Sequence, residues 1–323
     1  MISIITPTHK RMPLFDLTVK SVLSQTYSDY EWVVLDNSID GYFEKDFNDF
    51  IERNPKYSYR KDRVKIIRHR LEEVNIGYYK NECVRQTSCG LDDYVLLLDH
   101  DDFLVDTALE DIARLGKEYP MAQFISGDKI MLNYNIEKDE FYIFPQIENM
   151  SEDLNLQDLH SISGEVCLKV DDFCLNFGYI DNYSYRYYDV FDYLQSYHKQ
   201  YLSVTERPIH NKISPHPRCV KKGVLLNPMF GFYEGHPLSE DHVQCVMLGY
   251  FCQGAYLKKN TYVSILFSNH INTSFIPLPS KIVDSYKKML DNLDEFIKSY
   301  HQLFSHLPYH NTYLNVEGGT KIN

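Results

Sequence analysis

Short, nearly continuous apolar runs alternate with polar loops and amphipathic stretches through residues 1–105. Runs of this length without polar alternation are typical of strands buried on both faces, as in a parallel sheet. The stretches between them repeat apolar residues at helical spacing, and strand–helix alternation of this kind favours an α/β fold. Strands are predicted at 2–6, 32–35, 64–69 and 94–98, and helices at 14–23, 43–53 and 80–87.

Each predicted strand runs into a polar loop. In a parallel sheet these loops lie at the same edge, where open α/β sheets bind ligands. The pattern therefore predicts a ligand cleft lined by residues 8–10, 36–40, 75–77 and 99–102.

The last of these loops, Asp-His-Asp-Asp at 99–102, places three carboxylates within four residues. Such carboxylates repel one another unless a cation or solvent compensates them. Asp99 and Asp101, two residues apart at the end of a buried strand, could converge on one hard divalent ion. The alternative is an acidic turn in which Asp102 is the N-cap of a helix near 106–116.

The second half is less regular. It suggests a helix at 106–117, a strand at 121–126, a hairpin at 129–144, and strands at 161–170 and 262–267. Residues 280–304 have the spacing of an amphipathic helix. Packing against the body of the protein is its first interpretation, a homodimer contact the second and membrane-surface attachment the third.

Composition narrows the class of protein. The net charge of −12 argues against a protein that mainly coats nucleic acid or an anionic membrane. No apolar run approaches the roughly 18–20 residues of a membrane span, and the N-terminus lacks the layout of a signal peptide. The seven cysteines include no CxxC pair, which favours reduced thiols over a zinc site. The expectation is a cytoplasmic globular protein.

Four short motifs occur in order: TPT at 6–8, VVLDNSxDG at 33–41, NxGxxKN at 75–81 and LLLDHDD at 96–102. Together they resemble the family 2 glycosyltransferases with the GT-A fold, a mostly parallel, Rossmann-like nucleotide-sugar-binding sheet flanked by helices. The resemblance implies a catalytic domain over 1–275, with a nucleotide-sugar-binding half (1–105) and an acceptor-side half (106–275) containing an insertion near 171–230. A helical extension, 276–323, would follow.

The same resemblance implies roles for individual residues. Asp36 would bind the base, commonly uracil, and Lys80 stands where the family often has an arginine near the base or phosphate. Asp99 would contact the ribose side, and Asp101 would bind the metal that bridges the diphosphate. The full expected donor set is Thr6, Pro7, Thr8, Asp36, Asn75, Lys80, Asp99, His100 and Asp101, and the metal set is Asp99, Asp101 and His270.

An acceptor hydroxyl needs a general base, usually a carboxylate. The family places it in a Glu-Asp step at a helix start, and two segments fit. Residues 231–248 offer Glu240 and Asp241 and have the better motif, while residues 177–194 offer Asp189. For both, a solvated helix-capping carboxylate is the alternative.

Together these expectations predict a metal-dependent, inverting glycosyltransferase. Its donor would be a UDP-sugar bound with Mn²⁺ or Mg²⁺, and its acceptor a glycan or glycoconjugate. One rival is a sugar nucleotidyltransferase, but the loop TPTHKR lacks the glycines of a phosphate loop. A second rival is a catalytically silent glycan-binding module, against which the intact acidic loop argues.

Overall fold

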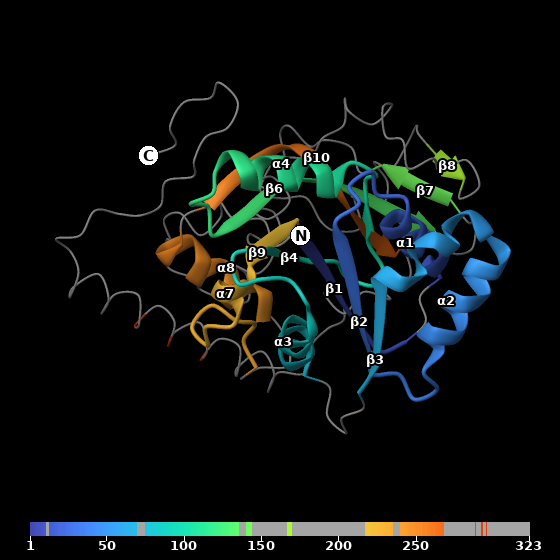
Figure 1. Ribbon diagram of the computed structural model, residues 1–323, viewed down its shortest axis with the longest axis horizontal. Helices are drawn as coiled ribbons and strands as arrows, with labels where there is room; N and C mark the ends of the chain where they lie inside the picture. Colours follow the sequence, from blue (N-terminus) through green and yellow to red (C-terminus); the bar gives the residue numbers. More distant parts are fainter. Residues whose placement is uncertain are drawn as a thin grey trace, which may run out of the picture.

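The computed structural model describes most of the N-terminal half and separate parts of the rest (Figure 1). The described residues are 1–10, 13–69, 75–135, 140–143, 167–169, 217–234, 240–252 and 254–267, with Lys288, Asn292 and Glu295.

Four parallel strands form one half of the central sheet, in the order β3-β2-β1-β4. They are β1 (Ile2–Thr8), β2 (Tyr30–Asp36), β3 (Val64–Arg68) and β4 (Tyr94–Leu97). This confirms the predicted parallel sheet. Strand β1 continues two residues beyond the predicted end at residue 6, through Pro7 to Thr8. Pro7 is tolerated there because pairing with β4 stops earlier, at Ile5.

The other half of the sheet is mixed. It contains β9 (Arg218–Lys221), β6 (Phe124–Asn135), β10 (Gly254–Phe267) and β5 (Phe103–Leu104), in that order after β4. Strand β9 is antiparallel to both β4 and β6, whereas β6 and β10 are parallel. The predicted hairpin is confirmed, since β6 pairs with β7 (Glu140–Ile143), which also pairs with β8 (Cys167–Lys169).

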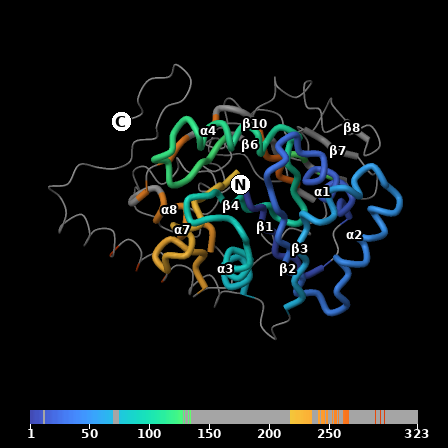
Figure 2. The backbone as a smooth tube through the Cα atoms, in the orientation of Figure 1, coloured from blue at the N-terminus to red at the C-terminus, as the bar shows by residue number. Residues whose placement is uncertain are grey.

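Helices cover both faces of the sheet, and side chains alternate between two apolar cores. Ile4 of β1 belongs to one core and its neighbour Ile5 to the other, as the two-residue period of a strand requires. The first core includes α1 (Phe15–Leu23), α2 (Tyr42–Arg53) and α4 (Ala108–Glu118). The second includes α3 (Ile76–Gln86), α7 (Lys222–Leu225) and α8 (Glu240–Phe251), which lie together in Figure 2. A 3-10 helix, η1 (Pro55–Arg63), leads into β3.

Of the predicted C-terminal helix, the structure describes three positions. Lys288, Asn292 and Glu295 have helical backbone and are exposed, which suits the polar side of an amphipathic helix. Within the described part of the chain, none of the helices has the length and apolar character needed to cross a membrane.

Candidate active site

The acidic loop follows β4 at the carboxyl edge of the parallel strands. Leu98 is fully buried and its N–H donates to Ile5 O at 3.0 Å, which extends the pairing up to the loop. The N–H of Asp102 then bonds to Asp99 O at 3.2 Å, so the loop is a tight turn. Asp99 and Asp101 are partly exposed.

Asp102 faces inward and joins the loop to β10. Its carboxylate accepts bonds from Tyr262 Oη and from the N–H of Ile265, both at 2.8 Å. The predicted N-cap role for Asp102 is therefore wrong. Helix α4 begins later, at Ala108, because β5 occupies the residues directly after Asp102. A buried carboxylate needs hydrogen-bond donors, and β10 supplies them.

The surroundings of Asp101 disfavour its ionised form. Burial and the neighbouring charge of Asp99 raise the pKa of Asp101 to about 7. A divalent cation between these two carboxylates would relieve the repulsion, and carboxylate oxygens are ligands that Mn²⁺ and Mg²⁺ accept.

Five carboxylates gather in this region, together with three buried cations. The carboxylates belong to Asp99, Asp101, Asp102, Glu240 and Asp241, and the cations to Lys80, Lys129 and Arg218. The excess of negative charge suits a divalent ion. Among the described residues, no three His, Cys, Asp or Glu side chains form a metal cluster. The partly exposed carboxylates of Asp99 and Asp101 fit an ion held by one or two carboxylates and completed by substrate phosphate oxygens.

Lys80 connects the acidic loop to the Glu-Asp step. Its buried ammonium donates to Glu240 Oε1 and lies 3.9 Å from Asp99 Oδ1. Burial lowers the pKa of Lys80, but the charges of Glu240 and Asp99 outweigh that effect and the net shift is upward. Two motifs that are 160 residues apart thus share one ammonium group.

This buried pair predicts a clear pattern in stability. Lys80→Met should cost about 3–5 kcal/mol, because it leaves Glu240 buried without its counter-ion. Lys80→Met combined with Glu240→Leu should be markedly more stable than Lys80→Met alone, since neither charge then remains. Urea unfolding of the three proteins checks this. Equal destabilisation in the single and double variants would contradict the pairing.

Helix α8 begins at Glu240, so the first helical turn carries both predicted carboxylates. Glu240 is buried, whereas Asp241 is partly exposed. Arg218 Nη1 donates to the backbone O of Asp241 at 3.2 Å. Asp189 and His270 lie outside the described residues, so their predicted roles stay predictions.

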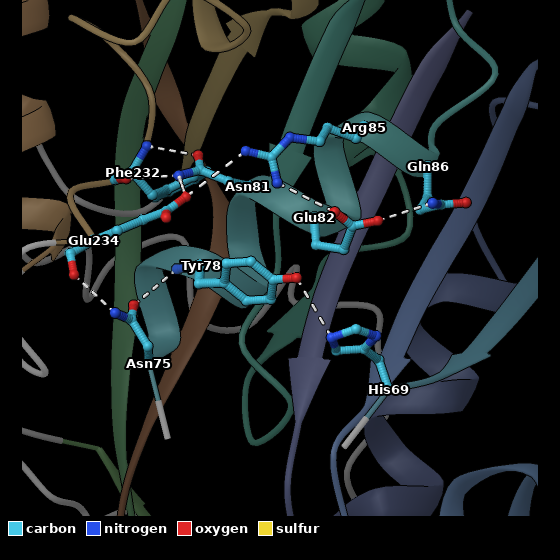
Figure 3. Close-up of polar contacts among 9 residues, drawn as sticks. All are labelled: His69, Asn75, Tyr78, Asn81, Glu82, Arg85, Gln86, Phe232 and Glu234. Atoms are coloured by element: carbon cyan, nitrogen blue, oxygen red, sulfur yellow. Dashed lines mark hydrogen bonds and ion pairs between the residues drawn. The ribbon is translucent and has the colours of Figure 1, made fainter. Parts of the chain in front are cut away.

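The NxGxxKN motif docks α3 against the segment that precedes α8 (Figure 3). Asn75 caps α3 by accepting from the N–H of Tyr78 at 2.9 Å, and its Nδ2 donates to Glu234 O at 2.7 Å. Asn81 holds the backbone of Phe232 at both polar atoms, with bonds of 2.8 Å to the N–H and 2.7 Å to the O. The bonds made by Asn75 are therefore those of a helix cap and a tether.

Gly77 permits this close approach. A Cβ at Gly77 would lie 2.2 Å from Tyr233 O, a backbone atom that cannot easily withdraw. Gly77→Ala is therefore expected to destabilise the protein by about 1–3 kcal/mol, despite the better helix propensity of alanine. Gly90→Ala is the control, because the Cβ there would meet only the Asp93 carboxylate, at 3.3 Å. Equal urea midpoints for the two variants would contradict this reason for Gly77.

The residues predicted to line the nucleotide pocket have internal partners. Thr6 Oγ1 accepts from Trp32 Nε1 at 2.9 Å, and Thr8 Oγ1 bonds to Tyr42 Oη. The carboxylate of Asp36 accepts from the N–H groups of Ser38 at 2.8 Å and Phe43 at 3.2 Å. These side chains shape the rim of the site, and their contacts with a nucleotide stay predictions.

The loops after β1 and β4 meet through two imidazoles. The rings of His9 and His100 lie edge to face, with centroids 5.6 Å apart. Burial lowers the pKa of His100 to about 4, so the ring is neutral at pH 7. Its Nε2 is buried and has no hydrogen-bond partner in the described part of the chain.

Several residues of the site had no signal in the sequence. Lys129 of β6 is buried, and its neighbouring charges belong to Asp102, Asp99 and Asp241. Phe232 presents its ring to Lys80 Nζ at 5.6 Å and to Arg218 Cζ at 5.2 Å. Only strand pairing and helix docking bring these groups together, and neither can be seen in local spacing.

The sheet has a parallel half, with the acidic loop at its carboxyl edge, and a mixed half, with α8 beside it. This arrangement defines a GT-A-type α/β domain. Residues 3–161 match the family model described as glycosyl transferase family 2. This match covers just under half of the chain and makes its N-terminal part similar to glycosyl transferase family 2.

Solved structures show more distant similarity. TarS residues 1–349 from S. aureus is 16% identical, with a TM-score of 0.47 over 82% of this chain and 60% of that one. The same protein in complex with UDP-GlcNAc is 15% identical, with a TM-score of 0.48 over 86% and 61%. The mannosyltransferase PcManGT from Pyrobaculum calidifontis, in complex with GDP-Man and Mn²⁺, is 14% identical, with a TM-score of 0.45 over 82% and 56%.

This chain thus spans less than two thirds of the length of each of these proteins. No curated protein matches it.

Proposed function

We propose that the protein is a metal-dependent glycosyltransferase. It transfers a sugar from a nucleoside-diphosphate donor, most favourably a UDP-sugar, to a hydroxyl group of a glycan or other acceptor, with inversion at the anomeric carbon. The observation that carries this proposal is the Lys80 ammonium, which lies between Asp99 of the acidic loop and Glu240 beside Asp241. A donor-side motif and an acceptor-side motif thereby adjoin one another.

The donor side supplies charge compensation. Asp99 and Asp101 would hold the divalent ion, and an ion bound there neutralises charge on the leaving diphosphate. Lys80 keeps Asp99 in place from the buried side, 3.9 Å from its carboxylate. His100, predicted to contact the donor, is neutral at pH 7, and its buried Nε2 has no hydrogen-bond partner among the described residues.

The acceptor side supplies a base. Glu240 is committed to Lys80, which leaves Asp241 as the partly exposed carboxylate of the step. Asp241 would take the proton of the acceptor hydroxyl as the oxygen attacks the anomeric carbon. The dipole of α8 favours the carboxylate form. Asp189 is the alternative base.

The test is donor turnover with water as acceptor. The protein is incubated with Mn²⁺ and a panel of nucleotide sugars that includes UDP-GlcNAc and GDP-mannose, and release of nucleoside diphosphate is followed alongside the melting temperature. One donor should be hydrolysed and should raise the melting temperature only with metal. A panel in which no donor is hydrolysed and none shifts the melting temperature would overturn the proposal. Stabilisation without turnover would indicate a silent binding module.

A further inference from the structure

Arg218 is a buried cation that the transfer chemistry above does not use. It is the first residue of β9 and pairs with Leu97 of β4 and Ser126 of β6. Leu97 is the last residue of β4, so Arg218 lies beside the start of the acidic loop. Its side chain is only 1% exposed.

Among the residues that the structure describes, the guanidinium makes polar contacts through one nitrogen alone. Nη1 donates to Asp241 O and to Cys245 Sγ, both at 3.2 Å. Its Nε and Nη2 atoms are buried without hydrogen-bond partners. The hydroxyl of Ser126, directly paired with Arg218 across β6 and β9, is also fully buried and without a partner.

Unmade hydrogen bonds of this kind are costly. Each buried polar group without a partner costs about 1–3 kcal/mol, and more when the group is charged. Buried charged groups are therefore retained where something completes them, such as a water, an ion or a ligand. The two nitrogens Nε and Nη2 of Arg218 also have a specific geometry. They form the planar edge of the guanidinium that binds a carboxylate or phosphate through two parallel hydrogen bonds.

We propose that Arg218 and Ser126 form a subsite for an oxyanion, a phosphate or carboxylate group carried by the acceptor. The assignment to the acceptor rests on the proposed transferase function. It is favoured because Arg218 donates to the backbone O of Asp241, the candidate base, and the carboxylates that act on its charge are those of Asp241 and Glu240. An acceptor held there would bring its hydroxyl to the base.

Binding of inorganic phosphate tests the subsite without any turnover. The melting temperature is measured against phosphate concentration in metal-free buffer at constant ionic strength, for the wild type, Arg218→Gln and the control Arg85→Gln. Arg85 is a half-exposed arginine on α3. Phosphate should raise the melting temperature of the wild type and of Arg85→Gln but not of Arg218→Gln. No shift in the wild type, or the same shift in Arg218→Gln, would overturn the subsite.

A second variant covers the case in which Arg218→Gln does not fold. Ser126→Ala removes one buried hydroxyl and should weaken phosphate binding about 10–100-fold, as the loss of one hydrogen bond to a charged group implies. Unchanged phosphate affinity in Ser126→Ala would count against the subsite.

Repeating the phosphate titration with saturating UDP and Mn²⁺ shows whether the anion at the subsite comes from the acceptor or from the donor diphosphate. If the phosphate-dependent shift adds to that of UDP, the subsite is separate from the donor diphosphate, as proposed. If UDP abolishes it, the anion belongs to the donor and the acceptor assignment fails. Donor turnover in the wild type is measured independently, so a failure of the subsite is distinguishable from a failure of the transferase function.

Discussion

Asp101→Ala is expected to reduce metal-dependent donor turnover by about 1000-fold or more. The estimate follows because a bound ion supplies several kcal/mol of charge stabilisation, and each 1.36 kcal/mol is a factor of about ten. Asp101 and Asp99 are the partly exposed carboxylates of the loop, whereas Asp102 is held by Tyr262 and Ile265. Without Asp101, the metal loses one of the two carboxylates that fit it.

The measurement is a calorimetric titration with UDP, in the presence and absence of Mn²⁺, together with turnover. Asp92→Asn is the control, because this carboxylate is fully exposed at the opposite end of β4. The control should bind UDP and Mn²⁺ like the wild type. Metal-dependent UDP binding that survives in Asp101→Ala would remove the metal role assigned to this residue.

The same carboxyl predicts a pH dependence. Its pKa in the metal-free protein is raised to about 7, and the metal binds only the ionised form, so Mn²⁺ affinity should rise with pH and level off above about 7. The unfolded state ionises first, near its ordinary pKa of 3.8, so this group also lowers stability as the pH rises from about 4 to 7. Urea unfolding without metal should show a smaller decline for Asp101→Asn over that interval.

The parallel half of the fold could be predicted because its signal is local. A run such as Tyr94 to Leu98 is buried on both faces, and an uninterrupted apolar run is what such a strand requires. Strand β9 has no comparable signal. Its four residues, Arg-Cys-Val-Lys, lie between β4 and β6, more than a hundred positions along the chain from β4. The position of Arg218 follows from that pairing and from nothing in its neighbourhood in the sequence.

The candidate site shows the same division. Spacing alone brought Asp99 and Asp101 together, because two residues of one turn cannot move far apart. The NxGxxKN motif was predicted as a loop at 75–77 before a helix at 80–87, but α3 already begins at Ile76. Asn75 and Gly77 dock that helix, and Lys80 reaches Glu240. Those partners lie about 160 positions further along the chain, at a distance where sequence spacing carries no information.

Asp241→Asn is the second change with a large expected effect. Turnover should fall by about 10²–10⁴-fold, the usual contribution of a positioned general base, while UDP binding with Mn²⁺ stays close to that of the wild type. Binding should persist because asparagine keeps the shape of the side chain, and the Lys80 contacts with Glu240 and Asp99 are left in place. The readouts are initial rates with each donor and a calorimetric titration with UDP.

The matched variant is Asp189→Asn, which tests the alternative base. If Asp241 is the base, Asp189→Asn should turn over at nearly the wild-type rate, and the reverse result would assign the base to Asp189. Glu240→Gln shows how the loss of a positioning residue differs from the loss of a base, because Glu240 is buried against Lys80 and has a positioning role. Its loss should lower stability as well as turnover, whereas loss of a partly exposed base should lower turnover alone. A rate loss in Asp241→Asn without a change in the melting temperature is therefore the result that assigns the base to Asp241.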